Sequence, residues 1–408
     1  MPLPVLDVKN LVLWYRTRKG PVHAVDDISF ALEAGQTIAL VGESGSGKTS
    51  TANSILRLLP KNVLRYEGKV VFDGQDVMEF DDEEFRKVVR WRGISMVFQG
   101  AMNALNPTTR VGSQVAEPLI VHYDIDRREA ADQAIEALGK VGLSGDIARR
   151  YPHELSGGMK QRVVIAMSLI LKPKVVILDE PTSALDVMTQ TNIINLLKDL
   201  KNAEHLSYIF ITHDLGLASE LADLVGIVYA GELVEVGPAE GVFVRPKHPY
   251  TGKLLASVPR LRSEAAPDFI PGVPPDLTDP PPGCRFHLRC PVSFEKCGWS
   301  APEFIEQVKL LQSSVETKDK VPAIEAMKAK DTQTLLIKPV ANGTVAEFAQ
   351  RLTSFIAQDQ ETYRFLKSVE SVQPKAKVVE VKLHEAMPPP LIGGDWRASC
   401  WLLEAGGS

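Results

Sequence analysis

The segment 42–49 constrains the fold of this chain most, because it reads Gly-Glu-Ser-Gly-Ser-Gly-Lys-Thr. Its three glycines let the backbone curl so that successive amide N–H groups point at phosphate oxygens. Lys48 then supplies a positive charge for the outer phosphates, and Thr49 supplies a hydroxyl for Mg²⁺. The apolar run 37–41 predicts a buried strand and residues 50–59 predict a helix, which is the context that such a loop needs. The segment therefore predicts an α/β fold that holds nucleotide phosphates.

A loop of this kind occurs in many nucleotide-binding families, but further segments follow it in a specific order. Residues 155–162 read Leu-Ser-Gly-Gly-Met-Lys-Gln-Arg and resemble the signature motif of ABC-type ATPases. Residues 175–180, Val-Val-Ile-Leu-Asp-Glu, resemble the Walker B segment of the same family. Residues 183–186 resemble the D-loop, and residues 212–214 resemble the segment that carries the switch histidine. Gln99 resembles the Q-loop glutamine, and Tyr15 resembles the aromatic residue that stacks on adenine. The resemblance spans about residues 5 to 240 and implies an α/β P-loop ABC-type ATPase core.

The resemblance implies a site for ATP hydrolysis, a phosphoryl transfer that depends on positioning and on charge neutralisation. Lys48 would hold the β- and γ-phosphates, and Glu180 would orient or deprotonate the attacking water. His213 would contact the γ-phosphate, and Gln99 would sense metal and water. Taken singly, such residues are more often structural, but their shared order favours a competent site. The implied ATP contacts are Tyr15, Gly42, Ser44, Gly45, Ser46, Gly47, Lys48, Thr49 and Ser50, and the implied Mg²⁺ ligands are Thr49, Gln99 and Asp179.

The signature residues would act on a different nucleotide from the one that Lys48 holds. In the family this segment caps ATP bound to a partner chain, and here it opens the helix predicted at 160–171. Each chain would then supply two half-sites, so full activity would need a dimer. The residues concerned are Ser156, Gly157, Gly158 and Met159 in the signature and Asp186 in the D-loop.

The pattern along the chain agrees with the ABC-type architecture. Residues 5–33 alternate as an antiparallel β layer would, and residues 36–99 and 163–235 read as the α/β core. A helical subdomain is predicted at about 100–165, where Ile135, Leu138, Val141 and Leu143 give one apolar face. In the family the loop 99–107 receives a short helix of the membrane subunit, so Met102 and Leu105 are expected to contact it.

Composition narrows the functional class further. The chain is 44% apolar and 24% charged with a net charge of −5, and its basic residues are scattered, so we expect no nucleic-acid partner. The longest apolar run, 163–171, is too short to cross a bilayer, and residues 1–4 lack a signal pattern. The chain is therefore expected at the cytoplasmic face of the membrane, with membrane spans supplied by other chains.

Beyond residue 240 the resemblance narrows to one branch of the family. His-Pro-Tyr-Thr at 248–251, a proline-rich linker at 271–282 and Gly-Cys-Arg-Phe-His-Leu-Arg-Cys-Pro at 283–291 resemble the tail of oligopeptide/dipeptide and nickel importer ATPases. The signature resembles that of the D-type subunit. This implies pairing with a homologous F-type ATPase subunit, two transmembrane permease subunits and an external solute-binding protein.

All four cysteines lie in this tail, as Cys284, Cys290, Cys297 and Cys400. A thiol cluster in a reducing compartment suggests metal more than disulfides, and the gaps of five and six residues suit zinc poorly. The resemblance implies a [4Fe–4S] cluster on these four residues, with a structural or regulatory role. Zinc and free thiols remain alternatives. The last cysteine lies unusually far along the chain, so an insertion is expected to separate it from the others.

The predicted organisation is an ABC ATPase domain at 1–240, a C-terminal regulatory extension with the cysteine motif at 241–300, an inserted α/β accessory domain at 301–390 and a tail at 391–408. Within the insertion, helices are predicted at 304–311, 345–355 and 363–369, and a strand at 378–383. The function implied is an ATPase that energises peptide import. Import of oligosaccharides or nickel, a soluble ATPase of DNA repair or translation, and a non-hydrolysing regulatory subunit are the alternatives.

Overall fold

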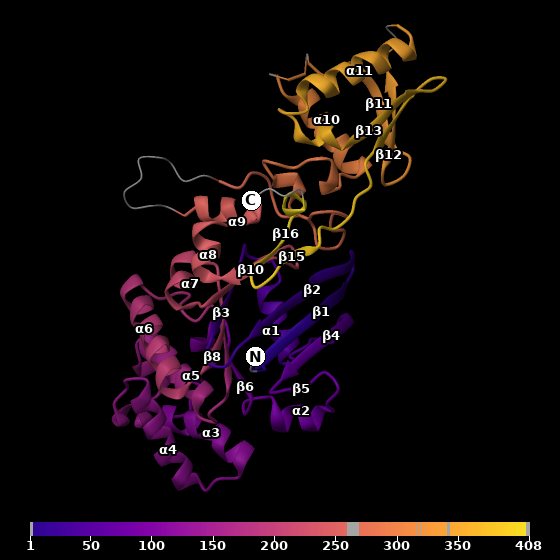
Figure 1. The fold of residues 1–408 in the computed structure, drawn as a ribbon. Coiled ribbons are helices and arrows are strands. Elements are labelled where there is room, and N and C mark those ends of the chain that lie inside the picture. The colour runs from indigo at the N-terminus through magenta and orange to yellow at the C-terminus, as the bar shows by residue number, and fades with distance from the viewer. Residues whose placement is uncertain (1–2, 259–268, 316, 319, 341–342, 405–408) are drawn as a thin grey trace. The chain divides into compact units, whose positions relative to one another are not determined.

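The computed structural model describes residues 3–258, 269–315, 317–318, 320–340 and 343–404. The chain divides into two compact units, Met1–Arg245 and Pro246–Ser408, whose elements are labelled in Figure 1. Among the described residues, no helix combines the length and the apolar character that a membrane span needs.

An antiparallel sheet opens the N-terminal unit, as the alternation at 5–33 predicts. Its order is β2-β1-β4-β5, with β1 at Leu6–Thr17, β2 at Gly20–Leu32, β4 at Val63–Phe72 and β5 at Gln75–Asp76. Strand β1 carries Tyr15 opposite Val22 of β2 and Val63 of β4. This sheet therefore fixes where the predicted adenine-stacking residue lies.

A second, mainly parallel sheet forms the centre of the same unit. The strands run in the order β10-β9-β3-β8-β7-β6. They are β3 (Thr37–Val41), β6 (Ile94–Val97), β7 (Val175–Asp179), β8 (Ser207–Thr212), β9 (Leu224–Tyr229) and β10 (Glu232–Pro238). Strands β3, β6, β7 and β8 are buried throughout, as expected of parallel strands covered on both faces. The carboxyl ends of β3, β6, β7 and β8 meet at one edge, where ligands of parallel sheets bind.

Helices follow most of these strands. They are α1 (Lys48–Ile55), α2 (Asp82–Val88), α6 (Val187–Glu204), α7 (Leu215–Leu221) and α8 (Ala239–Val244). Helix α1 begins two residues earlier and ends four residues earlier than the helix predicted at 50–59. The helix predicted at 160–171 is α5, Gly157–Leu169, which starts directly after Ser156.

The region between β6 and α5 is helical, as predicted. It contains η1 (Ala101–Asn103), α3 (Val111–Tyr123), α4 (Arg127–Lys140), η2 (Gly145–Arg149) and η3 (Pro152–Glu154), and α3 and α4 both pack against α5 (Figure 1). Two expectations for this region are wrong. Ile135 is 44% exposed and does not belong to the buried face of α4. Leu105 is 6% exposed, so its side chain packs inside and is not offered to a partner.

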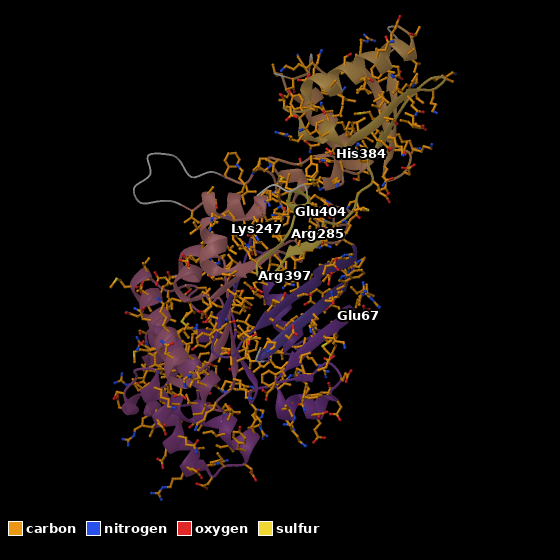
Figure 2. All side chains as sticks on the ribbon, in the orientation of Figure 1. Glu67, Lys247, Arg285, His384, Arg397 and Glu404 are labelled. Carbon is orange, nitrogen blue, oxygen red and sulfur yellow. The ribbon has the colours of Figure 1, made fainter. Side chains whose placement is uncertain are left out.

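The C-terminal unit contains the four cysteines, which lie in or beside short elements and loops. The short elements are α9 (Pro249–Ala256), η4 (His287–Arg289), η5 (Glu295–Cys297), the hairpin β15 (Leu391–Gly393) and β16 (Arg397–Ser399), and η7 (Trp401–Leu403). The proline-rich segment 271–282 has neither helix nor strand. Lys247, which is labelled in Figure 2, joins the two ends of this region. Its Nζ donates to the Trp396 carbonyl at 2.9 Å and lies 4.3 Å from the centre of the Trp396 ring.

Between the third and fourth cysteines the chain forms a four-stranded antiparallel sheet with two helices. The sheet order is β11-β12-β14-β13, with β11 at Ile324–Ala329, β12 at Thr334–Pro339, β13 at Val369–Pro374 and β14 at Val379–Leu383. The helices are α10 (Ala301–Ser313) and α11 (Val345–Asp359), both longer than predicted. The helix predicted at 363–369 is only the short 3-10 turn η6, Arg364–Ser368. These elements enclose a core of their own that includes Phe304, Leu335, Phe348, Leu352 and Val381.

Candidate active site

The loop between β3 and α1 is shaped by glycines that no other residue could replace without strain. Gly45 and Gly47 have positive φ angles of 77° and 107°. A Cβ atom on Gly47 would lie 2.2 Å from the Ala24 carbonyl oxygen, and one on Gly42 would lie 2.0 Å from that of Val228. Gly47 is also the N-cap of α1 and provides no side-chain hydrogen bond to it. The first backbone N–H groups of α1 are therefore available to an anion at the loop.

Lys48 lies inside this loop. Its Nζ donates to the carbonyl oxygens of Gly42 at 2.9 Å and Glu43 at 2.8 Å, and to Ser46 Oγ at 3.3 Å. Burial lowers the pKa of Lys48, against the opposing effect of the carboxylates of Glu180, Asp179 and Glu43. The loop thus holds one buried amine at the point where phosphate oxygens would enter.

Asp179 at the end of β7 faces the start of α1. Thr49 Oγ1 donates to Asp179 Oδ1 at 3.1 Å, and the carboxyl group is almost fully buried. Burial raises the pKa of Asp179 and Glu180 adds to that effect, whereas Thr49 and Lys48 oppose it. A carboxylate beside a hydroxyl is a pair of hard oxygen ligands of the kind that Mg²⁺ prefers. A divalent cation would offset the cost of burying this charge, so Thr49 and Asp179 fit a magnesium site.

Glu180 brings together two further residues from neighbouring strands. Gln99, two residues after β6, donates from Nε2 to Glu180 Oε2 at 2.9 Å. His213 follows β8, and its Nδ1 lies 3.1 Å from Glu180 Oε1. Glu180 itself has a positive φ of 46°, and its backbone N–H donates to the Ile211 carbonyl at 2.9 Å. Three strand ends thus present a carboxylate, an amide and an imidazole to one point.

The remaining predicted ATP contacts lie at the edge of this site. Tyr15 is half-buried on β1, and its hydroxyl lies 3.5 Å from Ser50 Oγ in α1. Ser44 is exposed, and Ser46 is buried. The structure therefore brings Tyr15 and Ser50 together beside the phosphate-binding loop.

The signature and the D-loop lie together and line a groove of about 760 Å³. Ser156 is the N-cap of α5 and its Oγ accepts from the Met159 N–H at 3.3 Å. Asp186 caps α6 by accepting from the Thr189 N–H at 2.9 Å and its hydroxyl at 2.7 Å, and these bonds lower the pKa of Asp186. A Cβ atom on Gly158 would lie 2.7 Å from Thr189 Cγ2, so the two segments are in close contact.

The four cysteines line one small cavity in the C-terminal unit. The Cys284 N–H donates to the Cys297 carbonyl at 3.0 Å, which folds the two ends of the 284–297 loop together. Burial raises the pKa of Cys290 to about 12 and that of Cys297 to about 11, and neighbouring cysteines add to both effects. The thiols therefore converge, although no group of three or more His, Cys, Asp or Glu side chains within the described residues has the geometry of a metal site.

His248, the first residue of the His-Pro-Tyr-Thr segment, lines the same cavity, and the sequence does not predict its place beside the cysteines. It is the N-cap of α9, and its Nδ1 accepts from the Tyr250 N–H at 3.0 Å. Burial lowers the pKa of His248 to about 4. The available signal was the proline that follows it, because proline is frequent at the first position of a helix.

The comparisons with known proteins agree with this geometry. The family model described as ABC transporter matches residues 25–183, and the model described as oligopeptide/dipeptide transporter, C-terminal region, matches residues 234–297. The chain is 46% identical over 290 residues to the oligopeptide transport ATP-binding protein OppD of Bacillus subtilis, which covers 70% of this chain and 81% of that protein. It is 45% identical over 299 residues to the dipeptide transport ATP-binding protein DppD of Bacillus subtilis, covering 72% of this chain and 88% of that protein.

Two solved structures resemble part of the chain. One is a dimeric post-hydrolysis state of the ATP-binding cassette MJ0796 bound to ADP and Pi, with a TM-score of 0.51, 30% identity and coverage of 57% of this chain and 98% of that one. The other is cbiO1 from Clostridium perfringens, part of the ABC transporter complex cbiONQ, with a TM-score of 0.52, 27% identity and coverage of 60% and 92%. The chain belongs to the ABC transporter family, as an ATP-binding protein of its oligopeptide/dipeptide transporter branch.

Proposed function

We propose that this chain hydrolyses ATP to energise the import of oligopeptides or dipeptides across a membrane. The observation that carries the proposal is the convergence of Gln99 and His213 on Glu180, beside Lys48, Thr49 and Asp179. The match to the oligopeptide/dipeptide C-terminal region supports the substrate class.

Each residue has a distinct part in the proposed reaction. Lys48 and the amides of the loop would bind the β- and γ-phosphates, and Thr49, Gln99 and Asp179 would hold Mg²⁺, whose charge would offset that of the phosphates. Glu180 would orient the attacking water and accept its proton, since its carboxylate is already held by two neighbours. His213 would contact the γ-phosphate, and Tyr15 would stack on the adenine.

The proposed assembly contains other chains. Ser156, Gly157, Gly158 and Met159 would cap the nucleotide of a second ATPase subunit, which we propose to be a homologous F-type chain. Two transmembrane permease subunits and an external solute-binding protein would complete the importer. This subunit would then be a peripheral protein at the cytoplasmic face of the membrane.

The first test is the substitution Glu180→Gln in the assembled complex. It removes the proton acceptor but keeps the hydrogen-bonding shape, so we expect it to trap an ATP-bound dimer and to lower turnover by at least about 100-fold. Gel filtration with ATP and phosphate release would measure both effects. Turnover at the parent rate would mean that the partner subunit's site carries out the measured ATP hydrolysis.

The second test concerns the transported solute. The complex would be reconstituted with its binding protein loaded with peptides, oligosaccharides or nickel, and ATP hydrolysis would be measured for each. We expect stimulation by peptides. Stimulation by sugars or nickel alone would leave the ATPase intact and exclude peptide import.

We further propose that Cys284, Cys290, Cys297 and Cys400 hold a [4Fe–4S] cluster. Four convergent thiols supply the ligand set of such a cluster, and the raised pKa values mean that the bare thiols are protonated near neutral pH. Iron would stabilise the thiolate forms that burial disfavours. The cavity is small, so its walls would need to move apart to accept four irons and four sulfides.

Protein purified without oxygen would test this cluster. We expect about four irons and four acid-labile sulfides per chain, with a brown absorbance that Cys400→Ser removes and Ser399→Ala retains. Bound zinc or an absence of metal would reject the cluster and would leave the ATPase site unaffected.

A further inference from the structure

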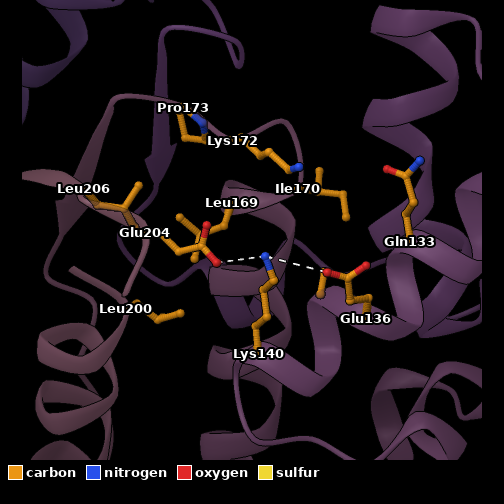
Figure 3. Close-up of a pocket in the computed structure, with 11 residues that line it drawn as sticks. Gln133, Glu136, Lys140, Leu169, Ile170, Lys172, Pro173, Leu200, Glu204 and Leu206 are labelled. Carbon is orange, nitrogen blue, oxygen red and sulfur yellow. Dashed lines mark hydrogen bonds and ion pairs between the residues drawn. The ribbon is translucent and has the colours of Figure 1, made fainter. Parts of the chain in front are cut away.

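A cavity of about 330 Å³ lies where the helical region 101–156 meets the ATPase core (Figure 3). Its apolar walls come from α4 on one side and from the ends of α5 and α6 on the other, through Ala137, Leu169, Ile170, Pro173, Leu200 and Leu206. The two parts are therefore not packed tightly here. Whatever crosses this gap has a direct influence on their relative orientation.

Lys140 crosses the gap. It is the last residue of α4, and its Nζ lies 2.8 Å from Oε1 of Glu204, the last residue of α6. The same Nζ lies 3.8 Å from Glu136 Oε1, one turn back on α4. Figure 3 shows Lys140 between the two carboxylates. One cation thus joins the helical region to the core.

Glu204 carries a negative charge at the end of α6, where the helix dipole disfavours it. A negative charge in the last turn of a helix is unfavourable because the carbonyl ends of the peptide dipoles point there. Lys140 at the end of α4 and the Glu136–Lys140 spacing are both favourable. Local helix stability accounts for Lys140 but not for Glu204, whose compensation comes from the other side of the cavity.

Helix α5 connects this cavity to the signature. Its last turn contributes Leu169 to the cavity wall, and Ser156 caps its first turn. The helix has 13 residues and is therefore about 20 Å long. Arg162 on α5 donates from Nη1 to the Val141 carbonyl at 3.0 Å, directly after Lys140. The end of α4 is thus tied to α5 by Arg162 and to α6 by Lys140.

We propose that Lys140 and Glu204 are positioning residues that set the angle of α5 against the core and so place Ser156 for the partner's nucleotide. The proposal rests on the proposed function, because it requires the signature to complete a partner site. The pair touches neither the phosphate-binding loop nor Glu180. It therefore acts on the productive dimer and not on nucleotide binding by a single chain.

The experiment compares Lys140→Glu, Glu204→Lys and the charge-reversed double variant, with Glu136→Gln as the matched control. ATP hydrolysis by the assembled complex would be measured as kcat/KM at low salt, together with the nucleotide affinity and thermal unfolding of this chain alone. We expect each single reversal to lower kcat/KM by about three- to tenfold, since it replaces the attraction between residues 140 and 204 with a repulsion. Monomer affinity should not change, the double variant should recover, and 1 M salt should remove the differences because the screening length falls to about 3 Å.

Three results would overturn the proposal. These are unchanged kcat/KM in both single variants, no recovery in the double variant, or a change in thermal unfolding alone. The variant Ser156→Arg distinguishes a failure of the positioning role from a failure of the proposed function. If Ser156→Arg abolishes turnover while Lys140→Glu has no effect, only the positioning role is wrong. If Ser156→Arg leaves turnover intact, the two-chain site itself is wrong.

Discussion

At the scale of single residues, the site depends on backbone conformations that side chains seldom adopt. The φ of 46° at Glu180 costs about 1 kcal/mol relative to ordinary backbone. Its hydrogen bonds to Ile211, Gln99 and His213 hold this conformation. Within a regular strand, successive side chains point to opposite faces. The turn at Glu180 ends that alternation, so that Asp179 reaches Thr49 while Glu180 reaches the residues after β6 and β8.

The phosphate-binding loop offers a matched pair of substitutions that tests steric need against backbone strain. Gly47→Ala would place a Cβ atom 2.2 Å from the Ala24 carbonyl oxygen, so the loop must move. Gly45→Ala meets no atom within 4 Å and imposes strain alone, at a φ of 77°. We expect Gly47→Ala to weaken ATP binding at least about tenfold, and Gly45→Ala to cost about 1 kcal/mol of stability with binding largely retained. Calorimetric titration with ATP and thermal unfolding would distinguish them, and equal behaviour of the two variants would contradict this account.

The sequence predicts which residues meet in the proposed ATP site better than it predicts which residues are buried nearby. Gln99, Glu180 and His213 each follow an apolar strand, and parallel strands bring their carboxyl ends to one edge, so their convergence could be foreseen. Leu105 could not be placed in this way. The preceding turn η1 and the two bonds between the Asn106 backbone and the Gln114 side chain fold it inward. Neither feature leaves a periodic pattern in the sequence.

At the scale of elements, α4 shows how small residues conceal a buried face. Its buried positions are Ala130, Ala134, Ala137 and Leu138, followed by Val141 after the helix ends. This stripe has helical spacing, but three of its members are alanines and contribute little apolar signal. Ile135 is the larger side chain one position away, which is why the sequence favours it, yet it is 44% exposed. Alanines permit the close approach of α3 and α5 that the helical region needs.

The buried face of α4 predicts that substitutions at two adjacent residues change stability to very different extents. Ala134→Leu adds volume at a fully buried position, so we expect it to destabilise the N-terminal unit by about 1–3 kcal/mol. Ile135→Ala removes an exposed side chain and should change stability by no more than about 0.5 kcal/mol. Urea unfolding of both variants would measure the difference. A greater loss of stability from Ile135→Ala than from Ala134→Leu would support the sequence prediction that Ile135 belongs to the buried face.

At the scale of the whole molecule, the segment inserted between Cys297 and Cys400 separates these cysteines along the chain but leaves them at one cavity in space. A Cβ atom on Gly298 would lie 2.9 Å from Ala386 Cβ, so the chain leaves the cysteine loop and returns to it at one place. The inserted sheet and helices have their own buried core. They also contact the loop, since His287 Nε2 lies 3.4 Å from Glu303 Oε2 and its ring packs edge-on against Trp299. The linear distance between the cysteines therefore says little about their distance in space.

This junction predicts that the insertion can be removed. Replacing residues 299–385 by two glycines should keep the four cysteines around one cavity, because Gly298 and Ala386 already lie side by side. Some stability should be lost, since His287 loses both Trp299 and Glu303. The measurement is the rate at which a thiol reagent labels the folded protein, with ATP hydrolysis as the second readout; both should stay close to those of the parent.

A deletion of residues 309–380 is the control, because it cuts through α10 and β14 and leaves core residues such as Phe304 and Val381 without partners. We expect that variant to aggregate or to label rapidly. If the two-glycine deletion also exposes its thiols while ATP hydrolysis survives, the insertion is part of the scaffold that closes the cysteine cavity. The lost contacts of His287 with Glu303 and Trp299 would then account for the exposure, since they connect the cysteine loop to the start of α10.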